Sequence, residues 1–228
     1  MIVKNFDKKE YLKILKEIRG GYIYNYNGKI IKFDKIYAGE MLTHKRITSQ
    51  FGTIKKDQIE WLSRLNGKVN SSLPEGIVYY EGIPVGIIYP HYFEGYKNLF
   101  GVVDEDLSTF YDNITKATDN NLELIKNGVC NTDLAFKNVL YKDSDVQLID
   151  LDGNHIKRSS DSNYTEAYYY FIRDLFLVIK NRLLKTYSNE ETKELLSDLV
   201  QYFPKPSEFK YDTPYEMLDT VKRSKILK

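Results

Sequence analysis

The sequence predicts an α+β protein of two parts, the first rich in strands and the second mostly helical. Three observations support this fold class. Runs of β-prone residues beside glycine-containing turns occur over residues 12–33 and 76–92, and helical periodicity dominates from residue 104. The pattern changes at residues 92–95. We therefore expect a five-stranded antiparallel sheet with one helix over residues 1–92 and a mainly helical part over residues 93–228.

The first strands are predicted from a turn signal. Asn27 and Gly28 stand between two β-prone runs, which indicates a tight hairpin because both turn positions need positive φ. We expect a three-stranded antiparallel meander over residues 12–33. Residues 8–18 also have a helical pattern, so a helix in that segment is the alternative.

One helix and two more strands complete the expected first part. Residues 34–53 are polar and mixed, which is typical of an irregular loop, and residues 54–65 have the pattern of an amphipathic helix. The apolar side chains that gather on one face of this helix are Ile54, Trp61, Leu62 and Leu65. Strands are expected over residues 76–82 and 85–92.

The second part begins with a long predicted helix over residues 104–128, which Gly128 ends. A β-hairpin is expected around the turn Asp143-Ser144-Asp145. From Tyr164 the pattern is helical, in three segments: residues 166–185, residues 189–203 and a last helix near residues 214–222.

Composition excludes several classes of protein. The chain has 33 Lys and Arg against 32 Asp and Glu, so it lacks the basic excess of a nucleic-acid-binding protein. Cys130 is the single cysteine and cannot form an internal disulfide. The charged N-terminal segment does not resemble a signal peptide, and no apolar run is long enough to span a membrane. We expect a cytoplasmic protein without membrane or nucleic-acid partners.

The candidate chemistry concentrates in residues 131–153, which contain Asp133, Asn138 and Asp150. Phosphoryl transfer from ATP needs Mg²⁺ held by hard oxygen ligands, and it benefits from a carboxylate that orients the attacking hydroxyl. Asp133 can be that carboxylate, with Asn138 and Asp150 as metal ligands. The alternative is an ordinary loop, since Asp and Asn are common in turns.

These residues also carry a family resemblance. The pattern D-L-x-x-x-N, followed by a hairpin and then by I-D-x-D-G, resembles the catalytic and metal-binding loops of the protein-kinase-like superfamily. That superfamily includes protein kinases, aminoglycoside phosphotransferases and choline kinases. The resemblance implies a two-lobed fold with ATP between the lobes, and it identifies the chain as a compact, atypical member.

The resemblance covers about residues 12–185 and assigns further roles. Lys32 would anchor the phosphates of ATP, and Ile30 would stand at the roof of the adenine pocket. Backbone amides near His91 and Tyr92 would meet adenine at the hinge. Asp174 would support the catalytic loop. The alternative for Lys32, considered alone, is a solvated strand lysine, and the alternative for Asp174 is a surface carboxylate near the start of a helix.

The sequence departs from the family in several places. Only Gly20 and Gly21 remain of the glycine-rich loop. Gln58 occupies the inward position of the first helix where a glutamate usually pairs with the lysine, and Glu40 is another candidate partner. Asn131 replaces the usual histidine of the catalytic loop.

The expected function is an ATP- and Mg²⁺-dependent phosphotransferase, a kinase that moves the γ-phosphate to a hydroxyl of a protein or small-molecule acceptor. Asp150 and Asp174 are too close in sequence for a full peptide-docking segment, which favours a small acceptor or a compact protein kinase. The alternative is a pseudokinase, a nucleotide-binding or scaffolding module without transfer. A third possibility is an unrelated interaction domain. The acceptor and the oligomeric state stay open.

Overall fold

The computed structural model divides into two compact units. The first comprises Met1–Lys68, Ser72–Glu94 and Asp150–Gly153, and the second comprises Val69–Ser71, Gly95–Ile149 and Asn154–Lys228. The residues that the structure describes are 1–17, 22–33, 54–90, 93–131, 136–152, 156–158, 161–186, 188–200 and 213–223. Gly20, Gly21 and Glu40 lie outside them.

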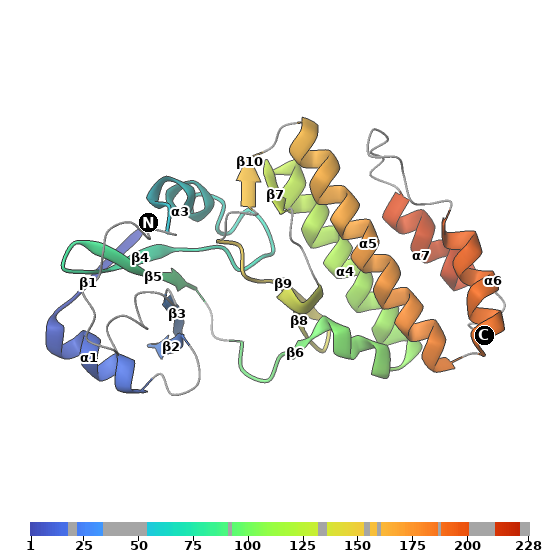
Figure 1. The fold of residues 1–228 in the computed structure, drawn as a ribbon, viewed down its shortest axis with the longest axis horizontal. Coiled ribbons are helices and arrows are strands. Elements are labelled where there is room, and N and C mark those ends of the chain that lie inside the picture. Colours follow the sequence, from blue (N-terminus) through green and yellow to red (C-terminus); the bar gives the residue numbers. More distant parts are fainter. Residues whose placement is uncertain are drawn as a thin grey trace. The chain divides into compact units, whose positions relative to one another are not determined.

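The first unit contains a five-stranded sheet in the order β1-β4-β5-β3-β2, with the expected number of strands but with β1 in a segment that was not predicted to be a strand (Figure 1). Its strands are β1 (Ile2–Phe6), β2 (Ile23–Tyr26), β3 (Lys29–Phe33), β4 (Gly76–Tyr80) and β5 (Ile83–Tyr89). The described sheet is mixed, because β1 runs parallel to β4 while the other pairs are antiparallel. The prediction of a wholly antiparallel sheet is therefore wrong in one strand.

The segment expected to form the first meander strand is instead helix α1 (Lys8–Glu17), as the alternative interpretation allowed. Tyr11, Ile14 and Leu15 are its buried residues, at helical spacing. The backbone N–H of Glu10 donates to Oδ1 of Asp7 at 2.7 Å, so an Asp caps the first turn. This hydrogen bond satisfies a backbone N–H group at the start of the helix.

The two hairpin turns of this sheet use left-handed backbone. Asn27 and Gly28 have φ of 52° and 79° between β2 and β3, which confirms the predicted hairpin. Glu81 and Gly82, with φ of 50° and 78°, turn the chain between β4 and β5.

Two helices pack on the sheet of the first unit, where one was expected. Helix α3 (Lys56–Ser63) confirms the predicted amphipathic segment, but its buried residues are Ile59 and Leu62. Trp61 is only half-buried, as are Ile54 and Leu65. The inward face is therefore rotated from the predicted one.

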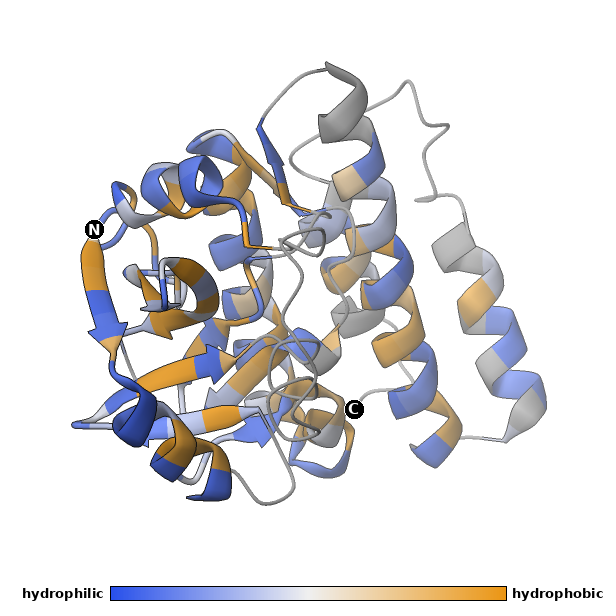
Figure 2. Cartoon of the chain, turned by 60° about the vertical axis from the view of Figure 1, so that its left-hand side comes forward, coloured by the Kyte–Doolittle hydropathy of each residue, from blue (hydrophilic) through white to orange (hydrophobic). Residues whose placement is uncertain are grey.

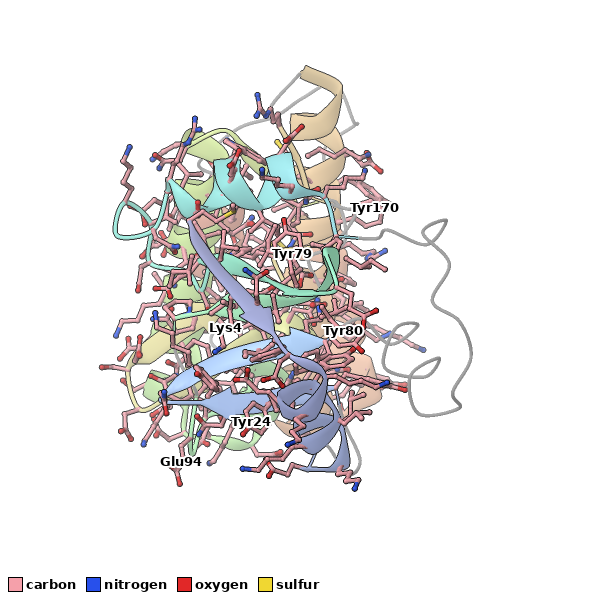
Figure 3. All side chains as sticks on the ribbon, turned by 90° about the vertical axis from the view of Figure 1, so that its left-hand side faces the viewer. Lys4, Tyr24, Tyr79, Tyr80, Glu94 and Tyr170 are labelled. Atoms are coloured by element: carbon pink, nitrogen blue, oxygen red, sulfur yellow. The ribbon has the colours of Figure 1, made fainter. Side chains whose placement is uncertain are left out.

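Successive residues of the strands belong to different hydrophobic clusters. Tyr80 packs with Tyr11 of α1, while its neighbour Tyr79 packs beside Ile59 of α3 (Figure 3). Because side chains alternate along a strand, α1 and α3 cover opposite faces of the sheet.

An ion pair also joins the first strand to the first helix: Nζ of Lys4 on β1 lies 3.2 Å from Oε1 of Glu10 on α1.

The second unit is mostly helical, as expected. Its strands are β6 (Lys97–Asn98), β7 (Val129–Asn131), β8 (Val139–Lys142), β9 (Asp145–Leu148) and β10 (Ile156–Arg158). Its helices are α4 (Leu107–Lys126), α5 (Asp161–Thr186), α6 (Asn189–Val200) and α7 (Thr213–Arg223), with short 3-10 helices at Leu99–Asp104 and Phe136–Asn138. Figure 2 shows hydrophobic and hydrophilic residues side by side along its helices, as expected where one face is buried.

Local signals set the boundaries in this unit. Gly128 has φ of 85° just beyond α4, which confirms the predicted end of that helix. Strands β8 and β9 pair antiparallel around Asp143, whose φ is 54°, so the predicted hairpin is confirmed. Within the described part of the chain, no helix is both long and apolar enough to cross a membrane.

Candidate functional site

A lysine and two aspartates form a cluster in the first unit. Lys32 lies on β3, and its Nζ donates to Oδ1 of Asp150 and, at 3.1 Å, to Oδ1 of Asp152. The sequence separation is 118 residues to Asp150 and 120 to Asp152. The structure thus brings together two of the residues predicted for the site, Lys32 and Asp150.

The two carboxylates differ in exposure. The side chain of Asp150 is 36% exposed, whereas that of Asp152 is 7% exposed. Burial alone would lower the pKa of Lys32, but the charges of Asp152 and Asp150 outweigh it and the pKa is raised. The Lys32 ammonium therefore keeps its charge in this cluster.

Backbone geometry helps to orient Asp150. Its φ of 63° is in the left-handed region, which Asp tolerates better than most residues other than glycine. The residue before it, Ile149, donates its N–H to the backbone oxygen of Asn138 at 2.9 Å. Asn138 itself is 9% exposed at the end of the 3-10 turn before β8. The predicted amide ligand is thus hydrogen-bonded through its backbone to the residue that precedes the predicted carboxylate ligand.

Asp152 is the residue that sequence reasoning missed. Its second carboxylate oxygen, Oδ2, is buried without a hydrogen-bond partner among the described residues, and so is the hydroxyl of Tyr89. Burial, followed by the nearby charge of Asp152, raises the pKa of Tyr89 well above its ordinary value. The signal for Asp152 was present, since it is the second aspartate of the I-D-x-D-G pattern.

Two further predicted site residues are Ile30, at the roof of the adenine pocket, and Gln58, as the helix partner of Lys32. Ile30 is half-buried and packs with Ile59 and Tyr89. Gln58 is half-buried on α3. Among the described residues, the hydrogen bonds of Lys32 go to the two aspartates and not to Gln58.

Two residues that the resemblance placed near the catalytic loop are buried. Asp174, on α5, is 4% exposed and accepts hydrogen bonds from Nε and Nη2 of Arg173 at 3.1 and 3.0 Å. The interpretation of Asp174 as a surface carboxylate is therefore wrong. Asn131 is 2% exposed at the end of β7, which pairs with β10.

Three predicted site residues lie outside the described residues: Asp133, His91 and Tyr92. Their assignments as the catalytic carboxylate and as hinge residues stay predictions.

The donor set suits a hard cation in its chemistry. Asp150 and Asp152 supply carboxylate oxygens, a ligand type that Mg²⁺ takes, while the role of Asn138, which belongs to the second unit, stays a prediction. Groups of three or more His, Cys, Asp or Glu placed to hold a metal do not occur within the part of the chain that the structure describes. A magnesium site here would therefore use oxygens from other sources, such as an amide, water or phosphate, alongside the two aspartates.

No model of a protein family matches the chain, and no curated protein matches it.

Proposed function

We propose that the protein is an ATP- and Mg²⁺-dependent phosphotransferase that acts on a hydroxyl group. The observation that carries this proposal is the contact of Lys32 with Asp150 and Asp152. The sequence resemblance assigned a phosphate-anchoring role to Lys32 and a metal-binding role to Asp150 from separate motifs. Their meeting in one cluster is what such a site requires, and it is the support for this proposal.

Each residue has a chemical role in this proposal. Lys32, with three N–H donors and a retained positive charge, would bind phosphate oxygens. Asp150, with the amide oxygen of Asn138, would hold Mg²⁺. When bound, the metal would neutralise charge on the transferred phosphoryl group. Asp133 would orient the acceptor hydroxyl and accept its proton.

Asp152 would position the lysine. Its carboxylate is the less exposed of the two and contacts Nζ directly, so it keeps Lys32 in place while Asp150 engages the metal. In this arrangement most of the rate gain comes from positioning and from charge neutralisation, not from covalent chemistry.

A transfer assay with radiolabelled ATP and Mg²⁺ tests the proposal, using self, a generic protein and a panel of hydroxyl-bearing small molecules as acceptors. Asp133→Asn should lower transfer by about 10²–10⁴-fold while the protein stays folded, because the positioned carboxylate is lost. Asp57→Asn, an exposed aspartate on α3, is the matched control and should transfer normally. Equal activity of wild type and Asp133→Asn would contradict the assignment.

A pseudokinase is the second candidate, and one observation favours it. Lys32 already pairs with both carboxylates, and Asp150 is the predicted metal ligand. The side chains expected to bind phosphate and metal are therefore paired with each other. A thermal-shift titration distinguishes the two functions, because a ligand that binds the folded state raises the melting temperature. Stabilisation by ATP and Mg²⁺ without transfer to any acceptor would support the pseudokinase.

A further inference from the structure

The second unit contains a cavity of about 550 Å³ that the proposed transfer reaction does not use. The start of α4, the β8–β9 hairpin and the segment around β6 form its walls. The lining residues that matter for its chemistry are Lys97, Glu105, Asp112, Asn113, Tyr141 and Asp143. Its volume falls within the range of about 300–1,000 Å³ that is usual for small-molecule sites.

Asn113 gives this cavity an unsatisfied polar group. The residue is 0% exposed, and neither Nδ2 nor Oδ1 has a hydrogen-bond partner within the described part of the chain. A buried amide without partners destabilises the folded protein, because both groups lose their hydrogen bonds to water. A ligand that offers one acceptor and one donor would satisfy both atoms.

Glu105 is held as a charged acceptor. Lys97 Nζ and Tyr141 Oη each donate to its Oε1 at 2.8 Å. These contacts, with that of Lys97 the larger, lower the pKa of Glu105. Because both donors reach Oε1, the described residues leave Oε2 of Glu105 able to accept a further hydrogen bond.

The remaining charges favour a cationic ligand. Asp112 and Asp143 are exposed, and neither side chain forms an ion pair with a described residue. Lys142 also lines the cavity, so three carboxylates face two ammonium groups. With Lys97 and Glu105 paired, the lining carries an excess of negative charge.

The lining of the cavity favours an organic cation over a metal ion. The described residues contain no group of three or more acidic, His or Cys side chains that converge to hold a metal, and that includes those lining this cavity. Two exposed carboxylates without a third ligand are better matched by the ammonium group of an organic molecule, whose other polar groups can meet the amide of Asn113.

We propose that this cavity binds a small organic molecule that carries a protonated amine next to hydroxyl or amide groups. The amine contacts the carboxylates of Asp112 and Asp143. A hydroxyl or amide group of the ligand exchanges hydrogen bonds with the side chain of Asn113. This site is independent of the proposed phosphotransferase function, because none of its lining residues belongs to the predicted transfer residues.

Nuclear magnetic resonance tests the proposal on the ¹⁵N-labelled full chain. The probes are glucosamine and spermidine, with glucose as the neutral counterpart of glucosamine. The side-chain NH₂ resonances of Asn113 are identified by their loss in Asn113→Leu, and if that variant does not fold, by Asn113→Asp. We expect these resonances to shift with glucosamine and not with glucose, and spermidine tests whether an amine without hydroxyl groups is sufficient. A shift with glucosamine alone identifies an amino sugar, whereas a shift with spermidine alone would contradict the proposal, because spermidine has no hydroxyl or amide group.

Substitutions then test whether the Asp112 carboxylate contacts the amine of the ligand. Asp112→Asn, an exposed and therefore tolerated change, should weaken binding of the amine by roughly two- to fivefold, the range expected for one exposed charge contact. Glu194→Gln, an exposed carboxylate on α6 of the same unit, is the control and should bind as wild type does. The proposal is overturned if neither amine shifts the Asn113 resonances, if glucose shifts them equally, or if Asp112→Asn binds unchanged.

Discussion

Lys32 Nζ lies 3.1 Å from Oδ1 of Asp152, a carboxylate whose side chain is only 7% exposed. The two residues are separated by 120 positions in the sequence. Because a buried carboxylate is costly to leave without a counter-charge, this contact anchors the segment after β9 to β3.

Lys32→Met should therefore lower stability as well as any activity. The change leaves the Asp152 carboxylate buried and unpaired, and since Lys32 is itself partly exposed we expect a loss of about 1–3 kcal/mol. Lys29→Met on the same strand is the control. It breaks the ion pair with the more exposed Glu75 and should cost at most about 1 kcal/mol. Urea unfolding measures both losses, and equal values would argue against a structural role for the Lys32 contact.

Tyr89→Phe should leave stability unchanged or raise it by up to about 1 kcal/mol, because it removes a buried hydroxyl that has no hydrogen-bond partner among the described residues. Tyr141→Phe provides the contrast. The Tyr141 hydroxyl donates to Glu105 at 2.8 Å, so its removal should cost about 1–3 kcal/mol. Thermal and urea unfolding compare the two variants. A loss of that size in Tyr89→Phe would mean that its hydroxyl binds the Asp152 carboxylate.

Local signals in the sequence predicted the elements that depend on local chemistry. The Asn27-Gly28 hairpin and the end of α4 at Gly128 follow from backbone that needs positive φ, and the structure has both. The pairing of β1 with β4 joins Ile2 to Gly76, and no turn or spacing links such distant residues. Helix α1 was ambiguous because its segment satisfies both periods, and the burial of Tyr11 against the sheet settles the choice.

The sequence predicted some residues of the candidate site but not their burial. Motifs named Lys32 and Asp150, and the structure places them in contact, while their roles toward ATP stay predictions. Asp152 had a signal as the second aspartate of the I-D-x-D-G pattern, but that pattern does not predict the burial of its side chain. The burial of Asn113 also had no signal, since a polar residue on a helix is normally assigned to the solvent face.

Gly76→Ala should detach β1 from the sheet. A Cβ added at Gly76 would lie 2.8 Å from both the carbonyl carbon and the Cβ of Ile2, which is closer than such atoms approach. Backbone cannot yield as a flexible side chain can, so we expect a loss of about 1–3 kcal/mol. Hydrogen exchange should show faster exchange at residues 2–6 and unchanged protection in the β2–β3 hairpin. Unchanged protection of residues 2–6 would contradict the parallel pairing.

Cys130 should make stability fall at alkaline pH. The thiol is 0% exposed, and burial raises its pKa from the ordinary value of 9.0 to about 11, with Lys157 opposing part of the effect. The folded state therefore keeps the proton that the unfolded state releases. The contribution of the protonated Cys130 thiol to the free energy of unfolding is fully present below pH 9. As the pH rises to about 11, we expect a loss of about 2–3 kcal/mol.

Cys130→Ala isolates this effect, because other groups with raised pKa values, such as Lys32 and Tyr89, also titrate at high pH. Urea unfolding of both proteins between pH 8 and 11 should show a difference in stability that shrinks as the pH rises. Wild type should also react slowly with a thiol reagent when folded and rapidly in denaturant, because only the exposed thiolate is nucleophilic. Rapid labelling of the folded protein, or a difference in stability that does not change with pH, would show that the Cys130 thiol is accessible and that its pKa is not raised.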